Sequence, residues 1–230
     1  RLRKRLPPFR YHAAERRKIT GAIILTITYE YGDNLYINVT NRCPNACDFC
    51  LRNNSTGSLY ADNLWYEGAE PTKEEILADL KKRDLNSYAE IVFCGYGEPT
   101  VRADMLVKTA QYIREHSDMK IRLNTNGLVR MIHPKFDIEQ FRGLIDVASI
   151  SLNAPDAKRY NEVTRPHFGE PAFKAMLDFA RDMKNMGVQV KFTVVDVITK
   201  DEIDRCQQLA DSMGIPLRVR EYITDNESYT

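Results

Sequence analysis

A regular alternation of short β-branched runs with segments of helical period constrains the fold of this chain more than any other feature. The strand-like runs fall at 35–40, 91–94, 120–124, 146–152, 188–195 and 217–222. Alternation of this kind is typical of parallel strands joined by right-handed crossovers. A closed barrel of eight strands takes about 250 residues. Six strands in a shorter stretch therefore predict an α/β fold of the partial (β/α)6 TIM-barrel type, with an open doubly wound sheet as the alternative.

The segments between these runs carry helix boundary signals. Thr72, with Glu75 three residues later, is a capping box that predicts a helix start. Gly187 and Gly214 stand where two later helices are expected to end. Two β-branched runs around Gly32 predict a hairpin or two successive strands. The expected helices are 72–85, 102–116, 171–186 and 200–213.

The chain has 230 residues, of which 43% are apolar and 28% charged, a composition that suits one domain with a real core. We expect a basic N-terminal tail at 1–20, a strand or hairpin extension at 21–34, the core domain at 35–223 and a C-terminal tail at 224–230. The first twenty residues carry a net charge of +7 and the rest −6, because the whole chain is +1. A basic tail suits contact with nucleic acid, whereas the Pro7-Pro8 pair favours a solvated tail.

The pattern of apolar residues and cysteines bears on the compartment. There is no run of about 18 apolar residues, so we expect no membrane-spanning helix. Five cysteines, three of them clustered, do not resemble a secreted disulfide framework. The sequence therefore predicts a protein of the reducing cytoplasm.

Three cysteines within eight residues, Cys43, Cys47 and Cys50, form a C-x3-C-x2-C run. Three thiolates on one loop can bind three irons of a [4Fe–4S] cluster and leave the fourth iron open, although such clusters commonly have four cysteine ligands. The alternatives are inert thiols or a zinc site in a module that contacts nucleic acid. Zinc prefers four ligands in two separated pairs, and Cys94 and Cys206 stand alone while the four histidines are scattered. The cysteine run therefore favours an iron–sulfur cluster.

Polar residues follow several of the predicted strands. In parallel α/β folds, ligands bind at the C-terminal ends of the strands. The second of these strands is followed by a glycine-rich turn that ends in Glu98-Pro99. Glycine lets the backbone approach a ligand, and a carboxylate accepts hydrogen bonds from an ammonium group. The alternative is that these residues only make turns. The other polar residues at strand ends are Asn124, Asn126, Ser151 and Asn153.

The cysteine run, with Phe49 in the aromatic slot before its last cysteine, resembles the signature of the radical S-adenosylmethionine (radical SAM) superfamily. The turn Gly95-Tyr96-Gly97-Glu98-Pro99 resembles the Gly-Gly-Glu-Pro motif of that superfamily, with Tyr96 interrupting the glycine pair. Among its members, the chain looks most like small radical SAM proteins associated with TatD-type nucleases. The resemblance implies a partial barrel in which S-adenosylmethionine (SAM) chelates the open iron. One electron from the cluster then cleaves SAM to methionine and a 5′-deoxyadenosyl radical that abstracts hydrogen from a substrate.

The resemblance also implies a role for each matching residue. Cys43, Cys47 and Cys50 are the cluster ligands and the catalytic centre. Phe49 is expected to contact the SAM adenine. Residues expected to bind the methionine end are Gly95, Gly97, Glu98 and Pro99. Residues expected to bind the ribose or the carboxylate are Asn124, Asn126, Ser151, Asn153 and Arg165.

The substrate and partners are expected only by class. The substrate is a nucleotide, a small metabolite or a partner protein, and a reductase or a flavodoxin-type protein supplies the electron. The alternatives to an oxidoreductase acting on a small substrate are an activase for a glycyl-radical enzyme and a cluster protein without catalysis. Arg218 and Arg220 lie two residues apart and hence on one face of the last strand. They either point to solvent or need an anionic partner inside the fold, which is SAM or an acidic substrate.

Overall fold

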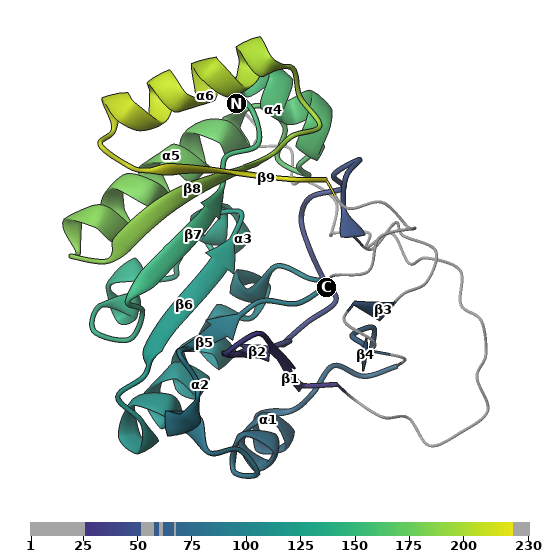
Figure 1. Ribbon diagram of the computed structural model, residues 1–230, viewed down its shortest axis with the longest axis vertical. Coiled ribbons are helices and arrows are strands. Elements are labelled where there is room, and N and C mark those ends of the chain that lie inside the picture. The colour runs from purple at the N-terminus through teal and green to yellow at the C-terminus, as the bar shows by residue number, and fades with distance from the viewer. Residues whose placement is uncertain (1–25, 52–57, 60–61, 67, 223–230) are drawn as a thin grey trace, which may run out of the picture.

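The computed structural model describes residues 26–51, 58–59, 62–66 and 68–222 (Figure 1). The tails predicted at 1–20 and 224–230 lie outside the described residues. Between the ends of the described chain, a seven-stranded sheet with flanking helices forms the body of the protein.

The sheet has the strand order β1-β2-β5-β6-β7-β8-β9. β1 pairs with β2 in antiparallel fashion, and the remaining neighbours are parallel. The six parallel strands are those expected from the sequence, and β1 and β2 form the expected hairpin across Gly32, whose φ is 55°. The strand bounds are β1 Thr28–Tyr31, β2 Asn34–Ile37, β5 Glu90–Phe93, β6 Lys120–Thr125, β7 Val147–Ser151, β8 Gln189–Val195 and β9 Leu217–Arg220.

The strand order excludes the doubly wound alternative. In a doubly wound sheet the order reverses at a switch point, whereas here every crossover moves one strand further in the same direction. Crossovers of one hand then place their helices on one side of the sheet, and Figure 1 shows α1, α2, α5 and α6 outside a curved sheet. This is the architecture of an open, partial barrel, as the alternation of elements predicts.

Four expected helices are present, with the predicted caps. Thr72 accepts a hydrogen bond from the Glu75 backbone in a complete capping box. Gly187 and Gly214 follow two helices with positive φ angles of 85° and 58°. The α-helices are α1 Lys73–Leu80, α2 Ala103–His116, α3 Val129–Ile132, α4 Ala157–Thr164, α5 Pro171–Asn185 and α6 Lys200–Ser212. The 3-10 helices are η2 Leu85–Ser87, η3 Pro99–Arg102 and η4 Ile138–Phe141.

Three α-helices differ from expectation. α1 ends at Leu80 instead of residue 85, because the Asp84 carboxylate caps a separate 3-10 turn that begins at Leu85. The short α3 was not expected, and neither was α4. The N-cap of α4 is Asp156, whose carboxylate accepts a hydrogen bond from the Arg159 backbone, and only a short apolar pattern marks its eight residues.

The main core lies between the sheet and its helices. In β6, Ile121 and Leu123 are fully buried on the helix side, while Arg122 and Asn124 alternate with them and are half-buried. The residues opposite the helices therefore form a polar surface, which we call the inner face. Its side chains include Tyr36, Arg122, Asn124, Ser149, Lys191 and Thr193. Within the described part of the chain, the longest helices are too short and too polar to cross a membrane.

The described residues of the segment 53–71 include a short hairpin of β3 Ser58–Leu59 and β4 Asp62–Asn63. Leu64 and Tyr66, which follow β4, are both buried. The Asn38 amide donates to the Leu64 carbonyl at 2.7 Å, and the Asn41 amide donates to the Tyr66 carbonyl at 3.0 Å. The end of this segment is thus packed against the chain that leads from β2 to the cysteines.

Candidate active site

The cysteine loop begins after β2 and lies across the end of α4. The backbone N–H of Ala46 donates to the Thr164 carbonyl at 3.1 Å, and that of His167 donates to the Pro44 carbonyl at 2.8 Å. The Cys47 sulfur lies 3.7 Å from the Thr164 carbonyl. Cys43, Cys47 and Cys50 are partly exposed. α4 therefore acts as a rigid support that keeps the three thiols at the edge of the sheet.

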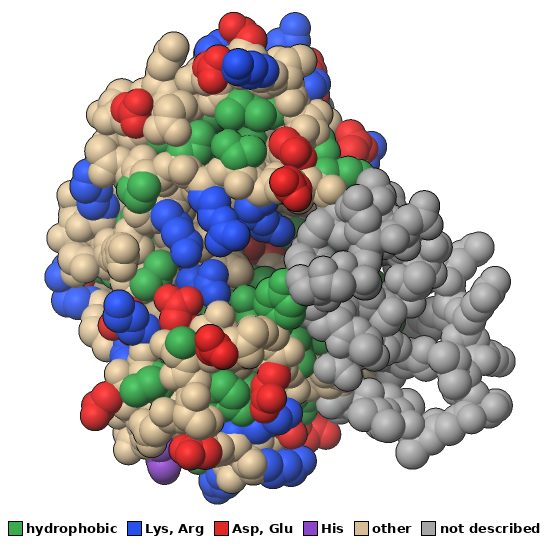
Figure 2. All heavy atoms as spheres, in the orientation of Figure 1, with side chains coloured by type: hydrophobic (Ala, Val, Ile, Leu, Met, Phe, Trp, Pro, Cys, Tyr) green, Lys and Arg blue, Asp and Glu red, His purple; other side chains and the backbone are tan. Residues whose placement is uncertain are grey.

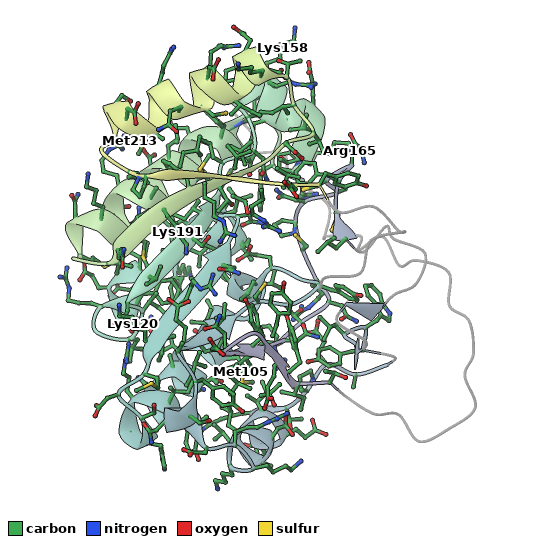
Figure 3. The ribbon with its side chains drawn as sticks, viewed as in Figure 1. Met105, Lys120, Lys158, Arg165, Lys191 and Met213 are labelled. Atoms are coloured by element: carbon green, nitrogen blue, oxygen red, sulfur yellow. The ribbon has the colours of Figure 1, made fainter. Side chains whose placement is uncertain are left out.

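Arg165 ties this support to the loop. It closes α4 in the left-handed conformation, with φ of 40°. Its guanidinium donates to the Ala46 carbonyl at 2.8 Å and forms an ion pair with Asp48, and Figure 3 labels Arg165 beside the loop. Arg165 thus has a contact with the cysteine loop itself, and its predicted contact with the SAM carboxylate stays a prediction.

The two glycines after β5 are needed where this turn crosses the chain that leads to Cys43. A Cβ atom on Gly97 would lie 2.3 Å from the Thr40 carbonyl oxygen and 2.6 Å from that of Arg42. A Cβ atom on Gly95 would lie 2.0 Å from the Asn38 side-chain oxygen. All three distances are far below van der Waals contact. The glycines therefore let the turn and the cysteine loop lie side by side.

Tyr96, which interrupts the glycine pair, has a packing role. Its side chain is buried and belongs to a small cluster with Tyr29 and Leu64. The ring centroids of Tyr96 and Trp65 lie 6.4 Å apart. The departure from the superfamily motif thus supplies an apolar contact to the end of the segment 53–71.

Glu98 is a buried carboxylate that joins two strand ends. It is 4% exposed. One oxygen accepts the Thr100 N–H at 3.1 Å, the Thr100 hydroxyl at 2.7 Å and the Thr125 hydroxyl at 2.6 Å, and the other accepts the Asn126 N–H at 2.7 Å. Burial raises the pKa of Glu98, and these hydrogen bonds oppose that rise. Pro99 begins η3 directly after it.

Asn126 connects Glu98 to the cysteine loop. Its backbone donates to Glu98, its side-chain oxygen accepts from the Leu128 N–H at 3.1 Å, and its side-chain nitrogen points to the Cys43 sulfur at 4.0 Å. The amide is therefore held in one orientation next to a predicted cluster ligand. Hydrogen bonds to cluster sulfurs are among the factors that set the reduction potential.

The other predicted residues lie at neighbouring strand ends. Asn124 points to the inner face, and its buried side-chain oxygen has no hydrogen-bond partner among the described residues. Ser151 ends β7 and is half-buried. Asn153 is buried and has a φ of 55°, a conformation that costs energy for any residue but glycine and is tolerated best by Asn and Asp. Phe49 packs against the edge of the main core.

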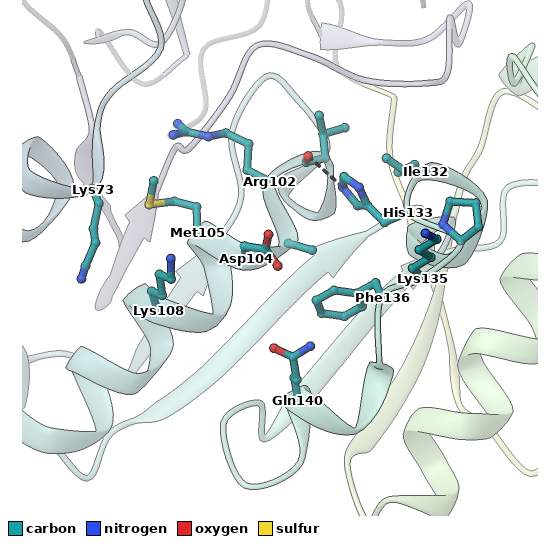
Figure 4. Close-up of a pocket in the computed structure, with 13 residues that line it drawn as sticks. Lys73, Arg102, Asp104, Met105, Lys108, Ile132, His133, Lys135, Phe136 and Gln140 are labelled. Carbon is teal, nitrogen blue, oxygen red and sulfur yellow. Dashed lines mark hydrogen bonds between the residues drawn. The ribbon is translucent and has the colours of Figure 1, made fainter.

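A pocket on the helix side of the sheet lies next to the turn that carries Glu98. His133 lies there, and its Nε2 is 3.1 Å from the Thr100 carbonyl and 3.0 Å from the Val101 carbonyl (Figure 4). These carbonyls belong to η3, so the histidine holds the turn that carries Glu98.

Sequence reasoning missed Arg122 and Lys191, which lie on the inner face with Cys94. Their only signal was strand alternation, since Arg122 stands between Ile121 and Leu123. Cys94, which stands apart from the cysteine run in the sequence, lines the inner face, and burial raises its pKa.

No group of three or more His, Cys, Asp or Glu among the described residues is placed to hold a single metal ion. A cluster differs from an ion in this respect, because each thiolate binds a different iron and the ligands need not converge on one point.

Replacing Glu98 by glutamine is expected to lower the free energy of unfolding by about 1–3 kcal/mol. In either orientation of the new amide, its NH₂ group would face a backbone N–H, that of Asn126 or that of Thr100, which leaves a buried donor without an acceptor. Urea denaturation measures this change. The matched control is Glu74→Gln on the exposed side of α1, for which no measurable change is expected. Equal effects in both variants would contradict the buried role of Glu98.

The fold has relatives among solved structures. The structure of anSMEcpe with bound AdoMet matches with a TM-score of 0.60 and 18% identity, over 82% of this chain and 51% of that chain. SuiB from Streptococcus suis, bound to S-adenosylmethionine, matches with a TM-score of 0.56 and 16% identity, over 87% and 44%. A radical SAM methyltransferase from Sphaerobacter thermophilus matches with a TM-score of 0.52 and 17% identity, over 84% and 68%. The chain spans about half the length of the first two, and at these identities the likeness concerns the fold.

No curated protein matches the sequence. The family model described as the radical SAM superfamily, in contrast, matches residues 37–212, which include the cysteine loop, the Glu98 turn and the whole of four of the six parallel strands. Radical SAM enzymes use a [4Fe–4S] cluster and SAM, the cofactor pair that the cysteine motif predicts. The extent of the match shows that this chain belongs to the radical SAM superfamily.

Proposed function

We propose that the chain is a radical SAM enzyme in which Cys43, Cys47 and Cys50 bind a [4Fe–4S] cluster, SAM binds at the fourth iron, and a substrate on the inner face loses a hydrogen atom. The observation that carries this proposal is the placement of the three-thiol loop. It lies against the Gly97-Glu98 turn and the Asn126 amide, at the strand ends that border the inner face.

The residues present fit these cofactors. Three partly exposed thiols on one loop provide a ligand for each of three irons. The same loop has no fourth cysteine, so the fourth iron is left for SAM. The buried Asn124 oxygen, without a partner among the described residues, would be satisfied by a donor from a bound ligand such as a ribose hydroxyl. When bound, the cluster and SAM supply one-electron cleavage to methionine and a 5′-deoxyadenosyl radical.

The chain's own residues would bind and orient. Glu98 accepts a single hydrogen bond at one of its oxygens, which leaves room for one more donor, such as the ammonium of a bound amino acid. The Asn126 side chain would donate to the Cys43 sulfur. Asn153 would present its side-chain amide to SAM from a backbone in the strained left-handed conformation. Phe49, Gly95, Pro99, Ser151 and Arg165 complete the proposed binding set.

The wider setting is part of the proposal. An external electron donor of the reductase or flavodoxin type is required, because the cleavage consumes one electron. No contact in the described chain favours the activase alternative over action on a small substrate. We place the protein in the cytoplasm, where a partly exposed cluster is better protected from oxidation.

The test is the EPR spectrum of anaerobically reconstituted, dithionite-reduced protein with and without SAM, together with iron, sulfide and zinc analysis. A [4Fe–4S]⁺ signal that changes shape when SAM is added supports the proposal. A signal indifferent to SAM indicates a cluster protein without this chemistry, and zinc without sulfide indicates the zinc-binding alternative. Either of these results overturns the proposal.

A further inference from the structure

A cavity of about 810 Å³ lies on the inner face of the sheet. It is bordered at one side by the hairpin of β1 and β2 and at the other by β9, the two ends of the sheet. Cys94 directly follows β5 and Asn124 lies near the end of β6, so these two lining residues are close in sequence to the strand ends that carry Glu98 and Asn126. Its size falls in the range of pockets that hold small-molecule ligands, about 300–1,000 Å³.

Four cations line this cavity. Arg122 comes from β6, Lys191 from β8, and Arg218 and Arg220 from β9. Arg218 lies beside Thr193 in the strand register, so the β9 arginines continue the surface that Lys191 begins. Figure 2 shows Lys and Arg gathered over these strands around a hollow, and Figure 3 labels Lys191 on the same side of the molecule.

These cations are incompletely neutralised by the protein. The Arg122 guanidinium lies 2.9 Å from Glu90. Among the described residues, no carboxylate lies within ion-pair distance of Lys191, Arg218 or Arg220. Glu90 and the lining residue Glu221 together leave an excess of two positive charges.

The excess of positive charge is confined to the surroundings of this cavity. Outside the first twenty residues the chain carries a net charge of −6, so a basic cavity does not follow from overall composition. Burial and the neighbouring Arg122 lower the pKa of Lys191, with Arg218 adding to the effect and Glu90 opposing it. Like charges that line one cavity are relieved by a bound anion.

We propose that this cavity binds the substrate through a phosphate monoester, with Lys191, Arg218 and Arg220 as the partners of the phosphate. This inference rests on the proposed function and names the substrate class of the same site. A phosphate monoester carries about −1.5 to −2 charges at pH 7, which matches the excess. A single carboxylate would leave half of the excess unbalanced. One guanidinium group binds two phosphate oxygens through parallel hydrogen bonds, and the lysine ammonium adds a point charge on a flexible side chain.

The position of the cations distinguishes this site from the SAM site. Lys191 lies on β8 and Arg218 and Arg220 lie on β9, at one end of the sheet, whereas the cysteine loop, Glu98 and Asn126 follow the C-terminal ends of β2, β5 and β6. The cysteines, Glu98 and Asn126 are joined at those ends. A phosphate held by the cations would therefore leave the rest of the substrate free to extend toward Cys94 and the cysteine loop.

The experiment measures binding of ribose 5-phosphate, ribose and inorganic phosphate to the reconstituted protein by isothermal titration calorimetry with SAM present. We expect ribose 5-phosphate to bind at least about tenfold more tightly than ribose, because one charge-assisted hydrogen bond is worth that factor or more. Inorganic phosphate should compete with it. Lys191→Gln and Arg218→Gln should each weaken binding about tenfold. Arg181→Gln, which removes an exposed arginine from α5 on the helix side, should leave binding unchanged.

The SAM-dependent EPR change, recorded on the same variants, distinguishes failure of the phosphate site from failure of the proposed function. Retention of that change in Lys191→Gln and Arg218→Gln supports a phosphate site distinct from SAM. Its loss together with phosphate binding would mean that the cations hold SAM, which overturns the inference. Equal affinity for ribose 5-phosphate and ribose, or equal binding in all three variants, overturns it as well. Phosphate binding by wild-type protein that shows no SAM response would refute the proposed enzyme activity and leave the anion site standing.

Discussion

Cys47→Ala protein, reconstituted anaerobically, is expected to lose the SAM-dependent EPR change and most of its cluster iron. The proposed cluster has three protein ligands, so removal of one leaves two irons without a thiolate. Cys47 also contacts the Thr164 carbonyl on the support formed by α4, and this contact disappears with the sulfur. Iron and sulfide analysis and the EPR spectrum of reduced protein measure the loss.

Cys206→Ala is the matched control, because it removes a thiol that is fully buried on the core side of α6. Iron content and the SAM response of this variant should equal those of wild-type protein. A Cys47→Ala protein that still binds a full cluster would show that the ligands lie elsewhere. A folded Cys47→Ala protein, checked by circular dichroism, ensures that the lost signal reports ligation.

Gly97→Ala is expected to lower the free energy of unfolding by about 3 kcal/mol, at the upper end of the usual cost of overpacking. The added methyl group would lie 2.3 Å from the Thr40 carbonyl oxygen and 2.6 Å from that of Arg42. Both obstacles are backbone atoms, so relief requires the chain before Cys43 to move. For a chain of this size the melting temperature should fall by about 6–12 °C, measured by thermal unfolding.

Gly143→Ala provides the comparison. At Gly143 a Cβ atom meets nothing within 4 Å, but φ is +71°, so the expected cost is only the backbone strain of about 1 kcal/mol. The difference between the two variants isolates the contact with the cysteine loop. Reconstituted Gly97→Ala should also hold less iron than Gly143→Ala, since the loop itself is displaced. Equal melting temperatures would refute the close approach.

The parts of the fold that the sequence predicts are those encoded within a few residues. The capping box of Thr72 and Glu75 and the glycines that close two helices depend on neighbours along the chain. The six parallel strands were evident from their β-branched runs, and right-handed crossovers fix how they connect. The superfamily was evident from the cysteine spacing, which the family model confirms.

The contacts that assemble the site were beyond the sequence because they join distant residues. The Arg165 side chain donates to the Ala46 carbonyl, which lies 119 residues away in the sequence. The apolar pattern of α4 is too short to predict that this helix supports the cysteine loop. The glycines were expected to make room for a ligand, whereas their nearest obstacles belong to 38–42. Strand register decides that Arg218 continues the surface of Lys191, and no local pattern specifies register. The assignments of individual residues to SAM remain predictions.

The order of the sheet has a consequence for solubility. In the described chain, β9 is the last strand and has a neighbour only on the β8 side. A bare strand edge invites another sheet to pair with it, and inward-pointing charges are a common protection against such aggregation. Arg218 and Arg220 supply those charges, next to the exposed Val219. A double variant that neutralises both arginines would therefore combine an uncharged edge with an exposed apolar side chain, and work with it calls for low protein concentration.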